Sequence, residues 1–145
     1  MAGILLTELV TTMPHPNERR LRDLYALFAS GDMPGFLSGC TDDVRFTVPG
    51  PNQITHNEPI AVFTKPTFSE LVAPVMQLSG GTFSEEVVDV FANDEHGVLL
   101  LVHRLQRDGQ PVEYRTADVV ELRDSKIASW RKWPGDVVEF ARAWA

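Results

Sequence analysis

The chain has 145 residues, 43% of them hydrophobic and 23% charged, which is the size and composition of one globular domain. Its formal net charge of −7, with 13 scattered basic residues, excludes a typical nucleic-acid-binding protein, because phosphate binding needs clustered Lys and Arg. A single cysteine, Cys40, excludes an internal disulfide and a cysteine-based metal site.

The first residues are apolar, but no basic segment precedes them and Glu8 interrupts them. We therefore interpret residues 1–16 as an N-terminal packing segment rather than a signal peptide, and residues 17–145 as a single domain. No stretch approaches the roughly eighteen continuous apolar residues that a membrane span requires. We expect no membrane partner and a cytoplasmic location.

Two helices are predicted after this segment. Asn17 can cap the first helix, and Gly31 can end it. Asp32 can cap a short second helix that carries Phe36 inward. Apolar residues recur in the first helix at three- and four-residue spacing, at Leu21, Leu24, Tyr25 and Phe28.

The middle of the chain mixes strand and helix signals. Residues 44–48 alternate in period two, which predicts a strand that buries Phe46 and Val48. A helical stretch is expected at 57–64. A second helix should begin with a capping box at residues 67–70 and end near Ser79.

The last third has the pattern of a β-meander. Asp108 and Gly109 form one expected hairpin turn, and Asp124 and Ser125 another. A final helix should begin after Asp136. The strand-like runs, rich in Val, Leu, Phe and Trp, are 82–92, 98–107, 112–122 and 126–133. This order predicts an α+β fold, a bent antiparallel sheet with helices packed on one face.

Strand alternation identifies the side chains that point inward. A two-residue turn at Asp108 and Gly109 pairs Leu99 with Asp118. The same face then includes Leu101, His103, Tyr114, Thr116, Val120 and Leu122. Its polar members are informative, because a buried polar group costs free energy unless it is paired or used.

Asp118 is the strongest candidate for chemistry. Desolvation raises the pKa of a carboxyl group, which would suit proton transfer near neutral pH. The alternative is a structural ion pair, since pairing across the last turn sets Arg131 opposite Asp118.

His103 is a second candidate, predicted to lie opposite Tyr114. It stands about 13 Å along the sheet from Asp118, so the two side chains could address two ends of one ligand. A rim or fully hydrogen-bonded histidine is the alternative. Either Trp130 or Trp133 should line the cavity, and a β-bulge would be needed to bury both with Ile127.

The sequence lacks the common motifs for bound groups. Four histidines show no metal-ligand spacing, and there is no glycine-rich phosphate loop or nucleophile elbow. We therefore expect neither a metal nor a cofactor.

Three segments carry a family resemblance: 25–32 (YALFASGD), 41–50 (TDDVRFTVPG) and 117–130 (ADVVELRDSKIASW). In order and spacing they resemble the SnoaL-like, or nuclear-transport-factor-two-like, superfamily, which includes ketosteroid isomerases and polyketide cyclases. The resemblance implies a cone-shaped, cystatin-like topology with a central pocket between sheet and helices. It also implies a homodimer formed through the outer face of the sheet.

The resemblance separates the branches of this superfamily. Asp118 matches the protonated acid of ketosteroid isomerases, but Val48 stands near their general base and cannot move a proton. Limonene-epoxide-hydrolase-like members need an Arg where this chain has Thr116. Polyketide cyclases fit better, with a histidine and an acid on adjacent strands, matching His103 and Asp118, and a tyrosine on the first helix, matching Tyr25.

Together these features predict a cofactor-independent cyclase, isomerase or hydrolase acting on a small hydrophobic, oxygen-bearing molecule, such as a polyketide-type intermediate. Asp118 would be the acid or base, and His103 and Tyr25 would position or polarise an oxygen. The expected ligand-binding residues are Phe46, Val48, Phe63, Met76, Tyr114, Thr116, Trp130 and Arg131. The alternative function is a non-catalytic small-molecule-binding or dimerisation module.

Overall fold

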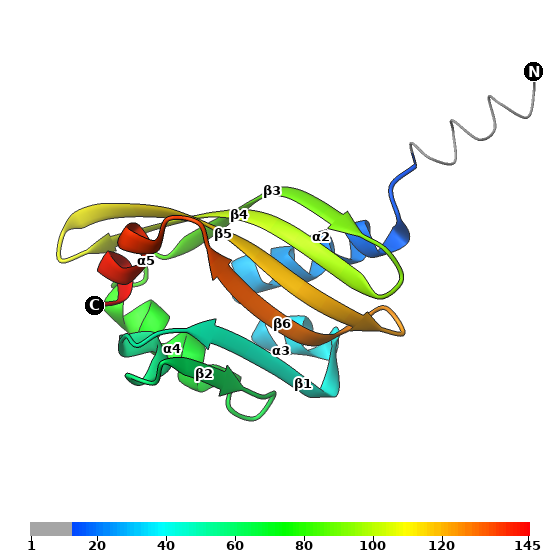
Figure 1. Ribbon diagram of the computed structural model, residues 1–145, viewed down its shortest axis with the longest axis horizontal. Helices are drawn as coiled ribbons and strands as arrows, with labels where there is room; N and C mark the ends of the chain where they lie inside the picture. The colour runs from blue at the N-terminus through cyan, green and yellow to red at the C-terminus, as the bar shows by residue number, and fades with distance from the viewer. Residues whose placement is uncertain (1–12) are drawn as a thin grey trace, which may run out of the picture.

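The computed structural model describes residues 13–145 and confirms the α+β fold (Figure 1). Most of the expected N-terminal packing segment, residues 1–12, lies outside the described residues. The helices are α2 (Pro16–Ala29), α3 (Met33–Ser38), the 3-10 turn η1 (Gln53–Thr55), α4 (Phe68–Leu78) and α5 (Val137–Trp144). The strands are β1 (Cys40–Pro49), β2 (Ile60–Phe63), β3 (Ser84–Ala92), β4 (His96–Arg107), β5 (Gln110–Arg123) and β6 (Lys126–Pro134).

The six strands form one curved sheet in the order β2-β1-β6-β5-β4-β3. All neighbouring strands are antiparallel except β1 and β6, which run parallel. Figure 1 shows α2 and α3 together on one side of the sheet, while α4 packs near β2 and α5 packs on β5. The sheet and these helices enclose the core, and the cavity described below lies between them.

Both predicted hairpin turns are confirmed. Asp108 and Gly109 have positive φ angles of 53° and 77°, and Asp124 and Ser125 have φ angles of 52° and 60°. Positive φ at both central residues gives a two-residue turn whose twist matches the twist of the flanking strands. The register between β4 and β5 follows from the first turn and pairs Leu99 with Asp118, as expected.

The expected inward face of β4 and β5 is also confirmed. Each of its side chains is at most 7% exposed, which places polar groups inside the core. These residues are Leu99, Leu101, His103, Tyr114, Thr116, Asp118, Val120 and Leu122. The polar members must therefore find their partners within the protein.

The prediction of a helix at 57–64 is wrong, because this segment contains β2. Ala61 and Phe63 are buried, while Ile60 and Val62 are exposed, which is the period-two alternation of a strand packed on one face. Pairing with β1 satisfies the backbone of this short edge strand.

Several helix caps also differ from expectation. The first helix begins at Pro16 with His15 as its N-cap, two residues earlier than an Asn17 cap implies. Thr67 precedes α4 but makes no side-chain cap; its hydroxyl accepts a hydrogen bond from the Thr64 N–H at 2.8 Å. The Asp136 carboxylate accepts from the Arg115 N–H and so ties α5 to β5.

Two β-bulges decide which charged residues face the core. In β3 the register shifts between Val87 and Asp89, so Val88 is the extra residue and Glu85 lies opposite His103. In β6 the partners of Leu122 and Glu121 are Ile127 and Ser129, so Ala128 is the extra residue. The second bulge sets Lys132 opposite Asp118.

The predicted pairing of Arg131 with Asp118 is therefore wrong. Arg131 lies opposite Val119 and is exposed on the outer face, where its guanidinium carbon is 5.5 Å from the centroid of the Trp133 ring. The same bulge resolves the alternative for the last strand. Trp130 is buried with Ile127, whereas the Trp133 side chain is 54% exposed.

Candidate functional site

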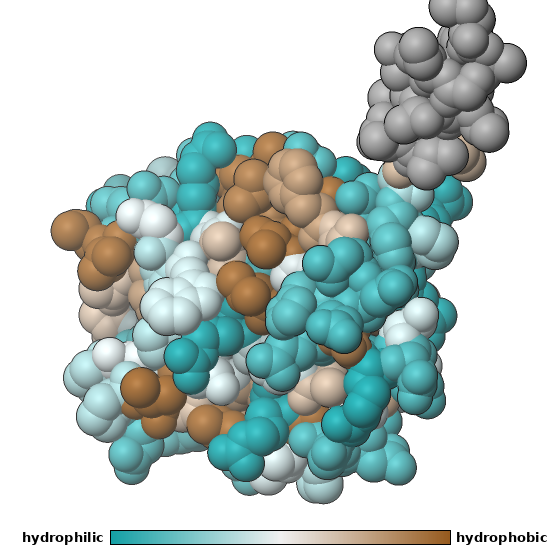
Figure 2. Space-filling model, turned by 45° about the vertical axis from the view of Figure 1, so that its right-hand side comes forward, coloured by the Kyte–Doolittle hydropathy of each residue, from teal (hydrophilic) through white to brown (hydrophobic). Residues whose placement is uncertain are grey.

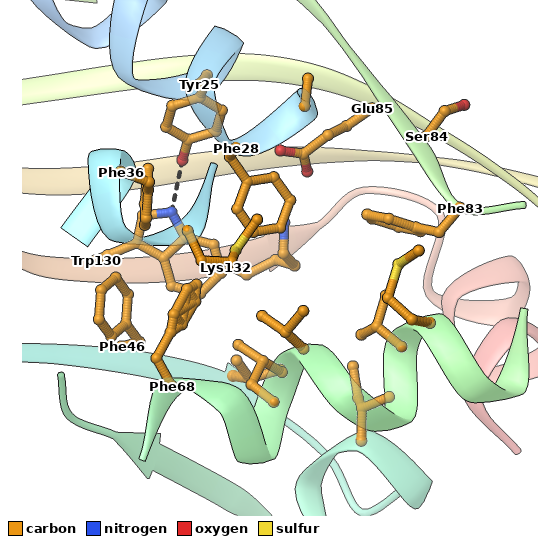
Figure 3. Close-up of a pocket in the computed structure, with 18 of the residues that line it drawn as sticks. Tyr25, Phe28, Phe36, Phe46, Phe68, Phe83, Ser84, Glu85, Trp130 and Lys132 are labelled. Carbon is orange, nitrogen blue, oxygen red and sulfur yellow. Dashed lines mark hydrogen bonds between the residues drawn. The ribbon is translucent and has the colours of Figure 1, made fainter. Parts of the chain in front are cut away.

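A cavity of about 380 Å³ lies between the inner face of the sheet and the helices (Figure 3). This volume falls within the range of about 300–1,000 Å³ that small-molecule sites occupy. Most of the wall is apolar, and aromatic rings dominate it. These rings belong to Phe28, Phe36, Phe46, Phe68, Phe83 and Trp130.

The aromatic wall is held by ring–ring packing. Phe46 and Phe68 stack with centroids 4.6 Å apart and planes 8° apart, and Phe46 meets the edge of Trp130 at 5.9 Å. The ring centroid of Phe36 lies 6.2 Å from that of Phe46 and 5.6 Å from that of Phe68. Because each ring restrains its neighbours, this wall offers a preformed aromatic surface to a hydrophobic ligand.

Polar groups gather at one end of the cavity. Tyr25 from α2, Glu85 from β3 and Lys132 from β6 line this end, and Figure 3 shows their side chains beside the apolar space. The Trp130 indole N–H donates to the Tyr25 hydroxyl oxygen at 2.6 Å. A ligand in the apolar space would therefore meet a carboxyl and an ammonium group at this end.

Asp118 lies directly behind this polar end and is fully buried. Its carboxylate accepts hydrogen bonds from the Tyr25 hydroxyl at 2.8 Å and from Lys132 Nζ at 2.9 Å. The Thr116 hydroxyl adds a longer bond of 3.4 Å. Three donors to two oxygens suit an ionised carboxylate, which only accepts hydrogen bonds.

His103 is fully buried beside this cluster, stacked on Tyr114 with ring centroids 4.6 Å apart. Its Nε2 lies 2.8 Å from the Thr116 hydroxyl and 3.4 Å from Lys132 Nζ. Burial, followed by the nearby Lys132 charge, lowers its pKa well below the ordinary value, so the ring is neutral at neutral pH. Thr116 thus links His103 to Asp118, although the two side chains are offset along the sheet.

Glu85 contributes a carboxyl group to the cavity wall. Burial is the main reason that its pKa rises from 4.5 to about 7; the negative charge of Asp118 adds to this, and Lys132 opposes it. Burial and the neighbouring carboxyl groups also raise the pKa of Tyr25 well above its ordinary value. At neutral pH the polar end therefore holds a neutral phenol and a carboxyl group that is harder to ionise than an ordinary glutamate.

The structure brings some of the predicted site residues to the cavity and not others. Those that line the cavity are Tyr25, Phe46, Val48, Met76, Tyr114 and Trp130. Asp118, His103 and Thr116 form a layer behind the cavity wall. Phe63 is buried outside the lining, and Arg131 lies on the outer face.

Sequence reasoning missed Glu85 and Lys132. A signal existed for Lys132, which lies two positions after Trp130 and so shares its face. No signal marked Glu85, because simple alternation across the β3–β4 turn would pair His103 with Glu86 instead.

Residues 13–145 hold neither a cluster of metal ligands nor a membrane-spanning helix. Within that range, no cluster of three or more His, Cys, Asp or Glu is arranged to hold a metal ion. No helix in the same range is long and apolar enough to cross a membrane.

A curved, mostly antiparallel sheet that encloses an apolar cavity with its helices defines a cystatin-like α+β domain. The chain belongs to the SnoaL-like domain family, whose family model matches residues 21–130. A comparison with curated proteins finds no match.

Solved structures show the same fold. A protein of unknown function with a cystatin-like fold from Xanthomonas campestris is 19% identical, with 92% of this chain and 99% of that one covered and a TM-score of 0.76. TerC, co-crystallised with polyporic acid, is 20% identical, with 88% and 97% covered and a TM-score of 0.75. IdmH from Streptomyces antibioticus, described as a candidate polyketide cyclase, is 17% identical, with 88% and 98% covered and a TM-score of 0.72.

Proposed function

We propose that this protein is a cofactor-independent acid–base enzyme, a cyclase, isomerase or hydrolase, that acts on a small hydrophobic molecule bearing oxygen. The observation that carries the proposal is the aromatic cavity whose polar end holds Tyr25, Glu85 and Lys132. Such a site would bind an apolar skeleton and place one oxygenated group beside ionisable side chains. IdmH, the candidate polyketide cyclase, supports a polyketide-type substrate, and TerC co-crystallised with polyporic acid supports binding of a small organic molecule.

In this proposal Lys132 binds the substrate oxygen. Its ammonium group gives one N–H to Asp118 and has two more donors, and it lies 4.9 Å from the centroid of the Trp130 ring at the cavity wall. A positive charge in a site of low polarity stabilises the negative charge that develops on a carbonyl oxygen during enolisation. Asp118 and Tyr25 hold this ammonium group and the wall in place, so Asp118 acts through its neighbours.

The alternative function is a non-catalytic small-molecule-binding module. The observation that favours it is the complete hydrogen bonding of Asp118 by Tyr25, Thr116 and Lys132, which a structural role alone would explain. The open cavity suits both functions. A measurement of turnover distinguishes the enzyme from the non-catalytic binding module.

The test is proton exchange next to a carbonyl group. In D2O we expect the protein to speed the incorporation of deuterium into 2-tetralone, a compact aromatic ketone, as measured by mass spectrometry. Val72→Trp would fill the cavity from α4 and should slow this exchange at least tenfold, whereas Val62→Trp, on an exposed position of β2, should leave it unchanged. Binding of 2-tetralone with exchange no faster than in buffer would establish the non-catalytic alternative.

We also propose that the protein is a cytoplasmic homodimer formed through the outer face of the sheet. Phe91, Leu100 and Trp133 expose apolar side chains on that face, at 54%, 38% and 54%. Figure 2 shows exposed hydrophobic side chains as brown patches that interrupt a mainly hydrophilic surface. Sedimentation velocity should give the mass of a dimer that Leu100→Glu converts to a monomer. A wild-type monomer at micromolar concentration would rule this interface out.

A further inference from the structure

The layer behind the polar end of the cavity contains one buried atom without a hydrogen bond. Among the buried side-chain nitrogens and oxygens of residues 13–145, His103 Nδ1 alone has no partner. The closest charged group is the Glu85 carboxyl, whose Oε2 lies 3.4 Å away. Glu85 lines the cavity, so this pair connects the ligand space to the buried layer behind it.

One arrangement of hydrogen bonds in this layer places the proton of His103 on Nε2. The Thr116 hydroxyl has one hydrogen and gives it to Asp118, so its oxygen accepts from His103 Nε2. A neutral imidazole with its proton on Nε2 presents a lone pair at Nδ1. That lone pair suits a protonated Glu85 carboxyl, which can donate to it, and repels an ionised one.

When Glu85 is ionised, the other neutral tautomer of His103 fits the hydrogen bonds around it. The neutral ring can carry its proton on Nδ1 and donate to the Glu85 carboxylate. Nε2 then becomes an acceptor: the Thr116 hydroxyl, 2.8 Å away, turns its hydrogen from Asp118 to Nε2, and Lys132 Nζ stands 3.4 Å away as a second donor. In both states His103 is neutral, and only its tautomer follows the charge of Glu85.

We propose that Glu85 is the group that takes a proton from the substrate and returns it, with His103 as the positioning residue whose tautomer adapts to each state. The inference rests on the proposed function. In the forward step a C–H bond next to the substrate carbonyl breaks and its proton forms an O–H bond with the Glu85 carboxylate. The electron pair of the C–H bond moves into the enolate, whose oxygen lies beside Lys132, and the reverse step restores the bond.

The surroundings of Glu85 support both protonation states near neutral pH. The charged groups facing it are the Asp118 carboxylate from β5, which disfavours ionisation, and the Lys132 ammonium from β6, which favours it. Tyr25 from α2 and Tyr114 from β5 face it as neutral phenols, because burial raises the pKa of each. A pKa of about 7 suits a group that both accepts and donates protons at neutral pH.

The first test needs no substrate. In protein labelled with carbon-13 in the Glu carboxyl groups and nitrogen-15 in His, one Glu signal should titrate with a midpoint near 7 and disappear in Glu85→Gln. The His103 nitrogen signals should switch from the Nε2–H to the Nδ1–H tautomer with the same midpoint. A Glu85 midpoint near 4.5, or a His103 ring that becomes an imidazolium, would overturn the inference.

The second test uses deuterium incorporation into 2-tetralone as a function of pH. Exchange should rise with pH through the Glu85 midpoint and fall about 100-fold in Glu85→Gln, the usual scale of a general base. The matched control is Glu86→Gln, since Glu86 is the next residue, points outward and is paired with Arg104. His103→Gln should move the midpoint of the profile more than it lowers the plateau.

The outcomes of the second test separate the two proposals. A wild-type protein that catalyses no exchange contradicts the proposed function. Normal wild-type exchange that Glu85→Gln leaves intact contradicts only the role of Glu85.

Discussion

Replacing Lys132 with methionine is expected to lower the free energy of unfolding by about 3–5 kcal/mol, the usual cost of breaking a buried ion pair. Asp118 is fully buried and Lys132 Nζ is 2.9 Å from its carboxylate. Without the ammonium group, a carboxylate would remain in the core with only the Tyr25 and Thr116 hydroxyls as donors. Chemical denaturation followed by tryptophan fluorescence measures the change.

A double-mutant cycle identifies the ion pair as the cause. Asp118→Asn together with Lys132→Met should be far less destabilised than the sum of the two single variants, since the double variant leaves no unpaired charge. Lys126→Met, at an exposed position of the same strand, is the control and should change stability by less than about 0.5 kcal/mol. Additive effects of the two buried substitutions would show that the charges do not stabilise one another.

Replacing Glu85 with glutamine is expected to stabilise the protein by about 3 kcal/mol at pH 8. The figure follows from the rise in the pKa of Glu85 from 4.5 to about 7, because each unit of pKa corresponds to about 1.4 kcal/mol. A carboxyl whose folded-state pKa is raised binds its proton more tightly in the folded state. Its favourable contribution is complete below about pH 4.5 and is lost as the pH rises through about 7. Glutamine keeps the shape of the side chain without the charge.

Unfolding free energies measured from pH 4.5 to pH 8.5 check this expectation. The wild-type protein should lose stability across this range relative to Glu85→Gln, and the two curves should converge at the acidic end. Glu86→Gln should follow the wild-type curve, because Glu86 lies on the exposed outer face. Parallel curves for the wild-type protein and Glu85→Gln would mean that Glu85 ionises in the fold as easily as in the unfolded chain.

Much of the fold could be predicted because its signals are local. Asp-Gly and Asp-Ser at the two turns favour positive φ angles, and alternation on both sides of each turn then sets the register. This reasoning correctly placed Asp118, His103 and Thr116 in the interior. A buried polar group on an apolar strand face is visible in a sequence whenever the turn before it is recognised.

The site itself depends on features that have no local signature. The extra residues in the two bulges, Val88 and Ala128, are ordinary strand residues, and what selects the bulges is the packing of whole strands. Each bulge reverses the parity of the residues beyond it. The sequence reasoning therefore assigned Arg131 to Asp118 and overlooked Glu85.

The predictions for two short segments were wrong for a related reason. Four residues, Ile60–Phe63, are too few to establish a period, and this strand exists because β1 offers it an edge. The Thr67 hydroxyl similarly bonds the loop before α4 instead of its first turn. Tertiary partners decided both outcomes.

The parallel pairing of β1 with β6 affects how the chain folds while it is being synthesised. Phe46 in β1 pairs with Trp130 in β6. The inner edge of β1, which is synthesised early, is therefore covered only after β6, the last strand, has been made. Until then β1 and β2 have no strand partner in the β3–β5 meander, and only helices and loops connect the two parts of the sheet. A chain released before β6 is made would have two unpaired strand edges that the complete sheet covers, at β1 and β5, and such edges favour self-association.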